Sequence, residues 1–219
     1  MPRFSWLHIV GLEQIPANGW PNLREALVRD LQQLHDRTGD WDVLMYVGAS
    51  AGQPGGIDGD VGLRRLSGLL AEPMFARQPS VVWLPGSNDI THRRGPVAKA
   101  ARAWDVDNEL RDEEFWAPGS PYLTDVTAAH AIPDMSPYRG AGEVRCGVLP
   151  GDAAWCWSLG ERRVGLMALN SRFLAWAKPD GLGTIHARQF AAVCGDDFGL
   201  VARKYDLALL LTCHPRDLL

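Results

Sequence analysis

Cysteine is scarce in this chain of 219 residues, and no two cysteines have the spacing of a metal or redox motif. There are four, and none form a Cys-x-x-Cys pair: Cys146, Cys156, Cys194 and Cys213. Because that spacing identifies zinc ribbons and dithiol active sites, neither is expected here. So few cysteines also favour a reduced, cytoplasmic compartment.

Long apolar runs and an excess of basic charge are also missing. No run approaches the roughly 20 residues of a membrane-spanning helix. Residues 1–10 lack the apolar segment and cleavage site of a signal peptide, so no membrane partner is expected. The formal net charge is −4, which argues against a nucleic-acid partner. Short basic pairs, such as Arg64 and Arg65, are expected on solvated faces.

Apolar residues are present in the amount that one sizeable domain needs. They make up 46% of the chain, and a chain of this length can bury a single large core. Neither an internal repeat nor a linker-like segment interrupts the sequence. We therefore expect one domain over residues 1–219.

The first half of the chain alternates between two kinds of apolar pattern. Short apolar runs at 5–10, 42–48 and 80–86 predict buried strands, and helical spacing between them predicts helices at 22–39 and 60–70. Three strands joined by two helices imply a parallel sheet with right-handed crossovers.

The first predicted helix has recognisable ends. Asn22 and Glu25 fit a capping box at its start, and Gly39 suits its end. Its buried face is predicted from the leucines and an alanine that recur at helical spacing: Leu23, Ala26, Leu27, Leu31 and Leu34.

The second half has a different pattern. An alanine-rich helix is predicted at 96–104, then an antiparallel hairpin at 153–170, a short helix at 187–194 and a buried strand at 205–213. Between them, the proline-rich segment 105–151 is predicted to be an irregular insertion.

The insertion is long enough to suggest a function of its own. We expect residues 104–151 to pack across the carboxyl edge of the sheet, where a substrate would otherwise enter. Its aromatic residues, including Trp116 and Tyr122, then offer a surface for a protein partner. Burial of these residues in the core is the competing interpretation.

Four of the predicted strands end in short polar or glycine-containing loops. These are VGLEQ at 10–14, VGASA at 47–51, PGSND at 85–89 and TCHP at 212–215. Open α/β sheets place their chemistry at the carboxyl ends of strands, so the loops are expected to converge. A two-metal site for phosphoryl chemistry would need carboxylates, imidazoles and an amide there.

With these loops the chain resembles the calcineurin-like metallophosphoesterases, in particular a bacterial branch found in large multidomain proteins. The family segments WLHLSDLHF, VTGDLAFSG and VPGNHDV are similar to WLHIVGLEQ, YVGASAGQPG and LPGSNDI. The family's LNSAWL and LLHHPLDWL are similar to LNSRFLAW and LLTCHPRDLL, and HARQF is similar to its glutamine-containing helix start. The resemblance covers almost the whole chain and implies a mixed sheet sandwich flanked by helices, with four layers α/β/β/α.

The resemblance also implies that the metal-binding motifs are degenerate. The family's first motif binds metal through an Asp and a His, at the positions of Gly11 and Glu13. Its metal-bridging Asp corresponds to Ala49. The remaining motif positions carry Ser87, Asn88, Asp89 and Cys213, followed by His214. The family's last motif, Gly-His-x-His, has no counterpart before the chain ends, which suggests a fold truncated at its carboxyl terminus.

The function implied is that of a catalytically inactive phosphoesterase-like domain without a cofactor. It would be an interaction or regulatory module in a bacterial signalling or defence protein, contacting a protein partner or further domains of the same polypeptide. Two alternatives stay open. An active metal-dependent phosphoesterase or nuclease could rebuild a Mn or Zn site, and a non-catalytic domain could hold a nucleotide or phosphate on the backbone N–H groups of VGAS and PGSND. The rebuilt metal site would use Glu13, Asp89, Cys213 and His214.

The polar side chains of these loops have structural interpretations as well. Glu13 suits a solvated loop, Asp89 can hydrogen-bond its own turn, and Cys213 suits a buried strand end. His214 could act as a general base, but the sequence contains no GxSxG nucleophile motif for it to serve.

Overall fold

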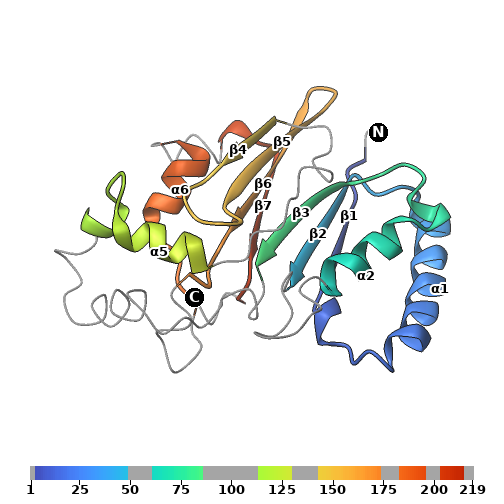
Figure 1. The fold of residues 1–219 in the computed structure, drawn as a ribbon. Helices are drawn as coiled ribbons and strands as arrows, with labels where there is room; N and C mark the ends of the chain where they lie inside the picture. Colours follow the sequence, from blue (N-terminus) through green and yellow to red (C-terminus); the bar gives the residue numbers. More distant parts are fainter. Residues whose placement is uncertain are drawn as a thin grey trace.

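The protein is a mixed α/β structure with two β-sheets (Figure 1). The computed structural model describes residues 3–48, 61–85, 113–129, 143–173, 183–195 and 203–214. In these ranges, no helix has the length and apolar character needed to cross a bilayer. The two sheets, together with the helices, confirm the predicted α/β class.

The first sheet contains three parallel strands in the order β1-β2-β3. They are β1 (Trp6–Val10), β2 (Val43–Gly48) and β3 (Ser80–Pro85). β2 is central, and its side chains are buried on both faces of the sheet. A strand buried on both faces needs a continuous apolar run, which explains why VLMYVG lacks the alternation of a half-exposed strand.

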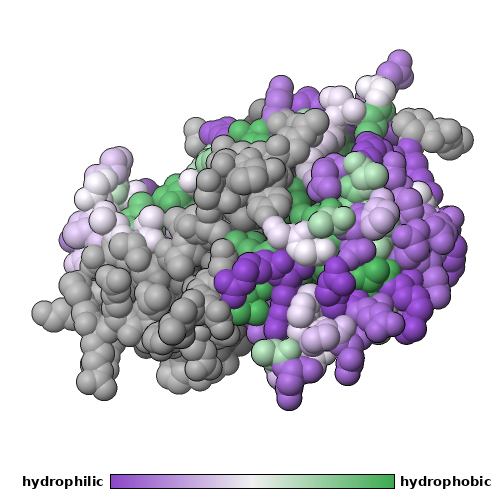
Figure 2. All heavy atoms as spheres, turned by 45° about the vertical axis from the view of Figure 1, so that its right-hand side comes forward, coloured by the Kyte–Doolittle hydropathy of each residue, from purple (hydrophilic) through white to green (hydrophobic). Residues whose placement is uncertain are grey.

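Two helices, α1 (Trp20–Thr38) and α2 (Val61–Leu70), cover one face of this sheet (Figure 1). Leu44 and Tyr46 of β2 share a buried cluster with Leu31 of α1 and Leu66 of α2. The short 3-10 helices η1 (Leu12–Gln14) and η2 (Pro73–Phe75) extend this layer. Figure 2 shows that the outer side of the layer is predominantly hydrophilic.

The start of α1 differs from the prediction. The helix begins at Trp20 with Gly19 at its N-cap position and Pro21 in its first turn, so Asn22 lies inside the helix and caps nothing. Proline suits this position because its fixed φ is already helical and its missing N–H would have no helical partner. The end was predicted correctly, since Gly39 has φ 72° and donates its N–H to His35 O (2.7 Å).

The buried face of α1 is also rotated from the predicted one. Leu23 and Leu34 are 45% and 37% exposed. Leu27 and Leu31 pack against the first sheet as predicted, and Val28, which was not predicted, packs beside them. The predicted face was shifted because Val28 was left out and two surface leucines, Leu23 and Leu34, were included.

The second sheet has the order β4-β5-β6-β7. Its strands are β4 (Glu143–Cys146), β5 (Ala153–Leu159), β6 (Arg162–Leu169) and β7 (Leu207–Thr212). The hairpin β5-β6 is antiparallel as predicted, β4 pairs antiparallel with β5, and β7 runs parallel to β6.

The segment 105–151 is not wholly irregular, contrary to the prediction. It contains α5 (Pro121–Ala129) and, near its end, β4, which forms an edge of the second sheet. β4 was missed because EVRC has few apolar residues, and three of its four side chains are exposed.

The two sheets pack face to face. Val43, Met45, Val82 and Leu84 of the first sheet share a buried cluster with residues of the second, namely Trp157, Val164, Leu166, Ala168 and Leu211. Helix α6 (Ala187–Cys194) packs on the outer face of the second sheet, where Val193 contacts the cluster of Met167 and Leu169. The layers are thus helices, sheet, sheet and helix.

One basic residue contradicts its prediction. Arg65 does not lie on a solvated face, because only 8% of its surface is exposed. It points inward from α2, and its contacts carry the inference drawn below.

Candidate functional site

The strands of both sheets bring four sequence-predicted positions to one edge of the molecule. β1, β2, β3, β6 and β7 all end at this edge (Figure 1). Val47, near the end of β2, and Cys213, just after β7, pack against the same core between the sheets. Gly11, after β1, is hydrogen-bonded to Val47, so the loops after β1 and β7 lie at the same edge, as predicted; the loops after β2 and β3 lie outside the described residues.

Gly11 follows β1 in a conformation that excludes other residues. Its φ is 70°, in the left-handed region that residues with side chains rarely adopt. Its N–H donates to Val47 O (3.2 Å), which joins the loop to β2. Gly11 therefore shapes the turn and offers no side-chain ligand.

Glu13 is half-buried, and its carboxylate has a hydrogen-bond partner on β2. The Tyr46 hydroxyl donates to its Oε2 (3.1 Å), and the carboxylate lies over the end of β2. A Cβ added at Gly48 would come within 2.6 Å of the same oxygen. The glycine that ends β2 thus makes room for the pair of Glu13 and Tyr46.

His214 is buried at the end of β7 and contacts Ser171. Only 6% of His214 is exposed, and its Nδ1 lies 2.8 Å from Ser171 Oγ. The N–H of Cys213 donates to the same Oγ (3.1 Å). A hydroxyl can donate one hydrogen bond and accept two, so Ser171 Oγ serves both the Cys213 N–H and the imidazole nitrogen.

Glycine is again required close to this site. A Cβ on Gly183 would lie 2.5 Å from Nδ1 of His214. Thr212 closes the turn by donating its hydroxyl to His214 O (2.6 Å). The segment TCH is therefore held by its own hydrogen bonds and by Ser171.

The other four predicted positions lie outside the described residues. They are Ala49, Ser87, Asn88 and Asp89. Within the described ranges, no three His, Cys, Asp or Glu side chains gather closely enough to hold a metal ion.

A buried polar network next to Ser171 was not anticipated. Asp152, before β5, is 4% exposed and accepts from the N–H groups of Asn170 (2.7 Å) and Leu149 (3.2 Å). The amide of Gln189 in α6 donates to both of its carboxylate oxygens, at 3.1 and 3.3 Å. Gln189 also donates to Asn170 O (3.1 Å). One carboxylate thus joins the starts of β5 and α6 to the end of β6.

Burial dominates the chemistry of this carboxyl group. Removal from water raises the pKa of Asp152 to about 7, although the hydrogen bonds from Asn170, Gln189 and Leu149 favour the charged form and act in the opposite direction. No cationic side chain is among these partners, so only neutral donors stabilise the negative charge.

The sequence contained a partial signal for this network. His186 and Gln189 form a capping box at the start of α6, in which the Gln189 side chain accepts from His186 N–H (2.8 Å). The segments LNS and HARQF were singled out as pieces of a resemblance, and each contributes one or more members. Asp152 gave no signal, because an aspartate after Pro150 and Gly151 is also typical of a surface turn.

The insertion contacts the same region. Trp116 stacks on His186 with ring centres 4.9 Å apart and packs against Phe173 at 5.8 Å. Phe173 follows β6, so this part of the insertion does lie at the carboxyl edge, as predicted. Trp116 is only 7% exposed. Of the two interpretations, burial in the core therefore holds for Trp116, whereas Tyr122 is half-buried on α5.

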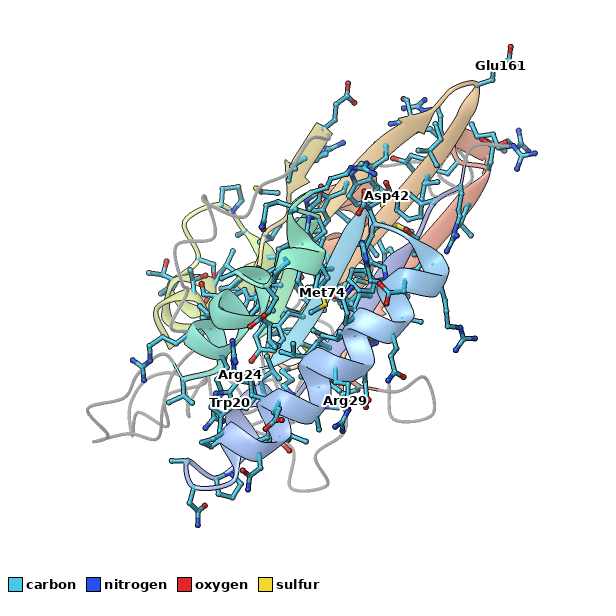
Figure 3. The ribbon with its side chains drawn as sticks, turned by 90° about the vertical axis from the view of Figure 1, so that its right-hand side faces the viewer. Trp20, Arg24, Arg29, Asp42, Met74 and Glu161 are labelled. Atoms are coloured by element: carbon cyan, nitrogen blue, oxygen red, sulfur yellow. The ribbon has the colours of Figure 1, made fainter. Side chains whose placement is uncertain are left out.

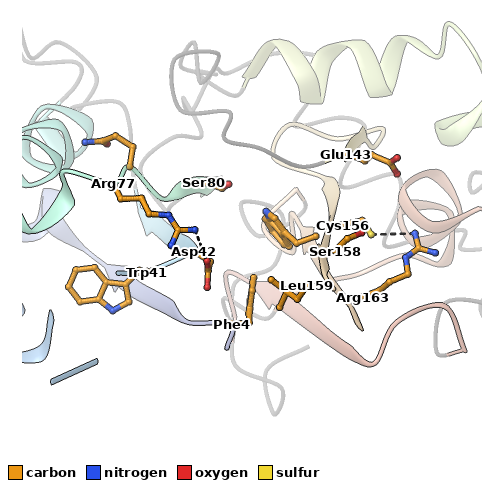
Figure 4. Close-up of a pocket in the computed structure, with 12 residues that line it drawn as sticks. Phe4, Trp41, Asp42, Arg77, Ser80, Glu143, Cys156, Ser158, Leu159 and Arg163 are labelled. Carbon is orange, nitrogen blue, oxygen red and sulfur yellow. Dashed lines mark hydrogen bonds and ion pairs between the residues drawn. The ribbon is translucent and has the colours of Figure 1, made fainter. Parts of the chain in front are cut away.

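A pocket of about 680 Å³ lies at the opposite edge, where β2 and β3 begin (Figure 4). On one wall, Arg77 donates to Asp42 (3.1 Å). On the other, Arg163 lies 3.4 Å from the sulfur of Cys156. Each arginine of this pocket already has a partner within the protein.

Comparisons with known proteins add no family assignment. No protein-family model, curated protein or solved structure matches the chain. The functional argument therefore rests on the residues and their geometry.

Proposed function

We propose that the chain is a non-catalytic phosphoesterase-like domain that acts as an interaction or regulatory module. The two packed sheets with helices outside them are consistent with the architecture of the calcineurin-like metallophosphoesterases that the sequence resembles. The carboxyl edge is where such enzymes bind their metals. In the proposal, this edge keeps the arrangement of strands and loops but has lost the side chains that bind metal.

The observation that carries the proposal is the way in which Glu13 and His214 are engaged. Glu13 accepts a hydrogen bond from Tyr46, and His214 is buried against Ser171. Gly11 offers no side chain at all. A two-metal centre needs several charged ligands directed at one point, and these side chains are directed at neighbours within the fold.

A structural role for the network around Asp152 supports the same conclusion. Its two carboxylate oxygens accept from three groups of the protein. The network fixes the loop before β5, the end of β6 and the start of α6 relative to one another. Rigid placement of these segments suits a surface that a protein partner or a neighbouring domain of the same polypeptide recognises.

The proposal places this module in the cytoplasm, within a larger signalling or defence protein. An active enzyme is the second candidate, favoured by the convergence of Glu13, Cys213 and His214 at one edge. Its metal would be Mn or Zn. The two candidates predict opposite results in one measurement.

The test combines elemental analysis with turnover. The purified chain, dialysed after incubation with Mn, Zn, Mg or Fe, is expected to hold less than a tenth of an equivalent of metal, on the order of background binding. It is expected not to hydrolyse a chromogenic phosphodiester. One equivalent or more of bound metal, with turnover abolished by Glu13→Ala or Cys213→Ala, would establish the enzyme instead.

A further inference from the structure

Arg65 is a buried cation whose partners in the structure are all uncharged. Its Nη1 donates to Leu12 O (2.6 Å) and to Ile15 O (2.8 Å). Its guanidinium lies over the ring of Trp20, 4.8 Å from the ring centre. Among the described residues, no carboxylate forms an ion pair with it.

A buried charge without a counterion is costly. Removing a guanidinium from water is unfavourable unless an opposite charge or sufficient hydrogen bonds compensate. Two carbonyls and one aromatic face offset part of that cost. Both hydrogen bonds use Nη1, so Nη2 and Nε remain for another acceptor.

The missing acceptor has a place to bind. A pocket of about 340 Å³ lies between α1 and α2 and is lined by Arg65 together with Ala17, Trp20, Arg24, Val61, Arg64 and Gly68. Three of these seven residues are arginines and none is acidic. Figure 3 shows Trp20 and Arg24 together near the amino-terminal end of α1.

The charge balance at the rim favours an anion. Arg24 forms an ion pair with Glu72, so that charge is neutralised. Arg65 has no such neighbour in the described part of the chain. Among the described lining residues, Arg65 is therefore a cation without an ion-pair partner, and η1 and Trp20 hold its guanidinium in place.

We propose that this pocket binds a small phosphorylated molecule. Arginine forks match the oxygens of phosphate in paired hydrogen bonds, and about 340 Å³ falls at the small end of ligand pockets. The phosphate would take the remaining donors of Arg65, and Arg24 would contribute a second cation. This proposal does not depend on the function proposed above.

Binding at this pocket would also affect the carboxyl edge, through η1. Arg65 holds the carbonyls of Leu12 and Ile15 on either side of Glu13. A ligand on the guanidinium would therefore strengthen the anchor of η1, whose Glu13 contacts the end of β2.

The experiment is a calorimetric titration of the full chain with pyrophosphate at constant ionic strength. Saturable binding with one site is expected for the unmodified protein. Arg24→Gln should weaken it about tenfold, the effect of losing about 1.4 kcal/mol, and Arg65→Met should abolish it. Arg29→Gln, an exposed arginine elsewhere on α1 (Figure 3), is the matched control and should leave it unchanged.

A variant with the opposite sign separates binding from folding. Glu72→Gln releases Arg24 from its ion pair and should tighten binding severalfold, which a merely structural role of the arginines would not produce. If Arg65→Met does not fold, Arg24→Gln and Glu72→Gln decide the question. The proposal is overturned if pyrophosphate does not bind, or if these two variants and Arg29→Gln all bind it equally. Equal affinity for citrate would overturn the assignment to phosphate.

Discussion

Ser171 Oγ and His214 Nδ1 lie 2.8 Å apart, and both residues are almost completely buried. One comes from the loop after β6 and the other from the loop after β7. Their contact joins two parallel strand ends where the resemblance would place a metal ligand. The same hydroxyl accepts from Cys213 N–H, so one serine serves two buried groups.

We predict that Ser171→Ala destabilises the protein by about 1–3 kcal/mol, because it leaves a buried N–H and a buried imidazole nitrogen without this partner. The free energy of unfolding is measured by urea titration. Ser158→Ala is the control, since Ser158 is exposed on β5 and should change stability by less than about 0.5 kcal/mol. Equal effects of the two substitutions would contradict a structural role for the contact.

The stability of the protein should depend on pH through Asp152. Its pKa is raised from 3.8 to about 7 by burial, so the folded state holds a proton that the unfolded state has released over that interval. Its contribution to stability is therefore complete below about pH 4 and is lost as pH rises through about 7. About three pKa units correspond to at most roughly 4 kcal/mol.

Asp152→Asn should remove this part of the pH dependence. The test compares the free energy of unfolding at pH 4.5 and pH 7.5 for the variant and the unmodified protein. Asp30→Asn, on the exposed side of α1, is expected to keep the original slope. An unchanged slope in Asp152→Asn would show that the hydrogen bonds to the carboxylate outweigh burial and keep it charged.

Among the described residues, most strands and helices were predictable because each has its own local pattern; α5 was not predicted, and the helix predicted at 96–104 lies outside these residues. The apolar runs of β2 and β3 and the glycine after α1 were sufficient for that. β4 was missed, since its exposed side chains carry no apolar signal, and α1 was started late because the effect of Pro21 was not weighed. The division of the strands into two sheets depends on packing between distant residues, such as Val82 and Leu166 of one buried cluster, and was predicted only through the resemblance.

The candidate site was less predictable than the fold. The positions of Gly11, Glu13 and His214 at one edge followed from strand topology. The partners of these residues did not, because Tyr46 and Ser171 look like ordinary members of a strand and a loop. Arg65 was misjudged for a similar reason: a basic residue next to another basic residue has the same pattern whether it faces water or a buried carbonyl.

Trp116→Ala should lower stability by about 3–5 kcal/mol, the usual cost of removing a buried tryptophan side chain. The reason is its contact with Phe173 and the stack on His186. Thermal unfolding measures the change, and Trp6→Ala, which removes a 45% exposed tryptophan, is the control with a smaller expected loss. A loss of stability no greater than that of Trp6→Ala would show that the Trp116 side chain is not buried.

Gly48→Ala is predicted to destabilise the carboxyl edge. A Cβ at this position would come within 2.5 Å of the Tyr46 hydroxyl and 2.6 Å of Glu13 Oε2. Both groups would have to move, and their hydrogen bond would be strained or broken, at a cost of about 1–3 kcal/mol. Gly68→Ala in α2 is the control, because a Cβ there meets nothing within 4 Å. Alanine in a helix interior is favoured over glycine by about 0.5–1 kcal/mol, so this control should gain stability.

Adding Glu13→Ala to Gly48→Ala should recover part of the loss, since it removes one of the two colliding groups. If the double variant is less stable than Gly48→Ala by the full cost of Glu13→Ala alone, the two residues do not interact and Glu13 is directed elsewhere.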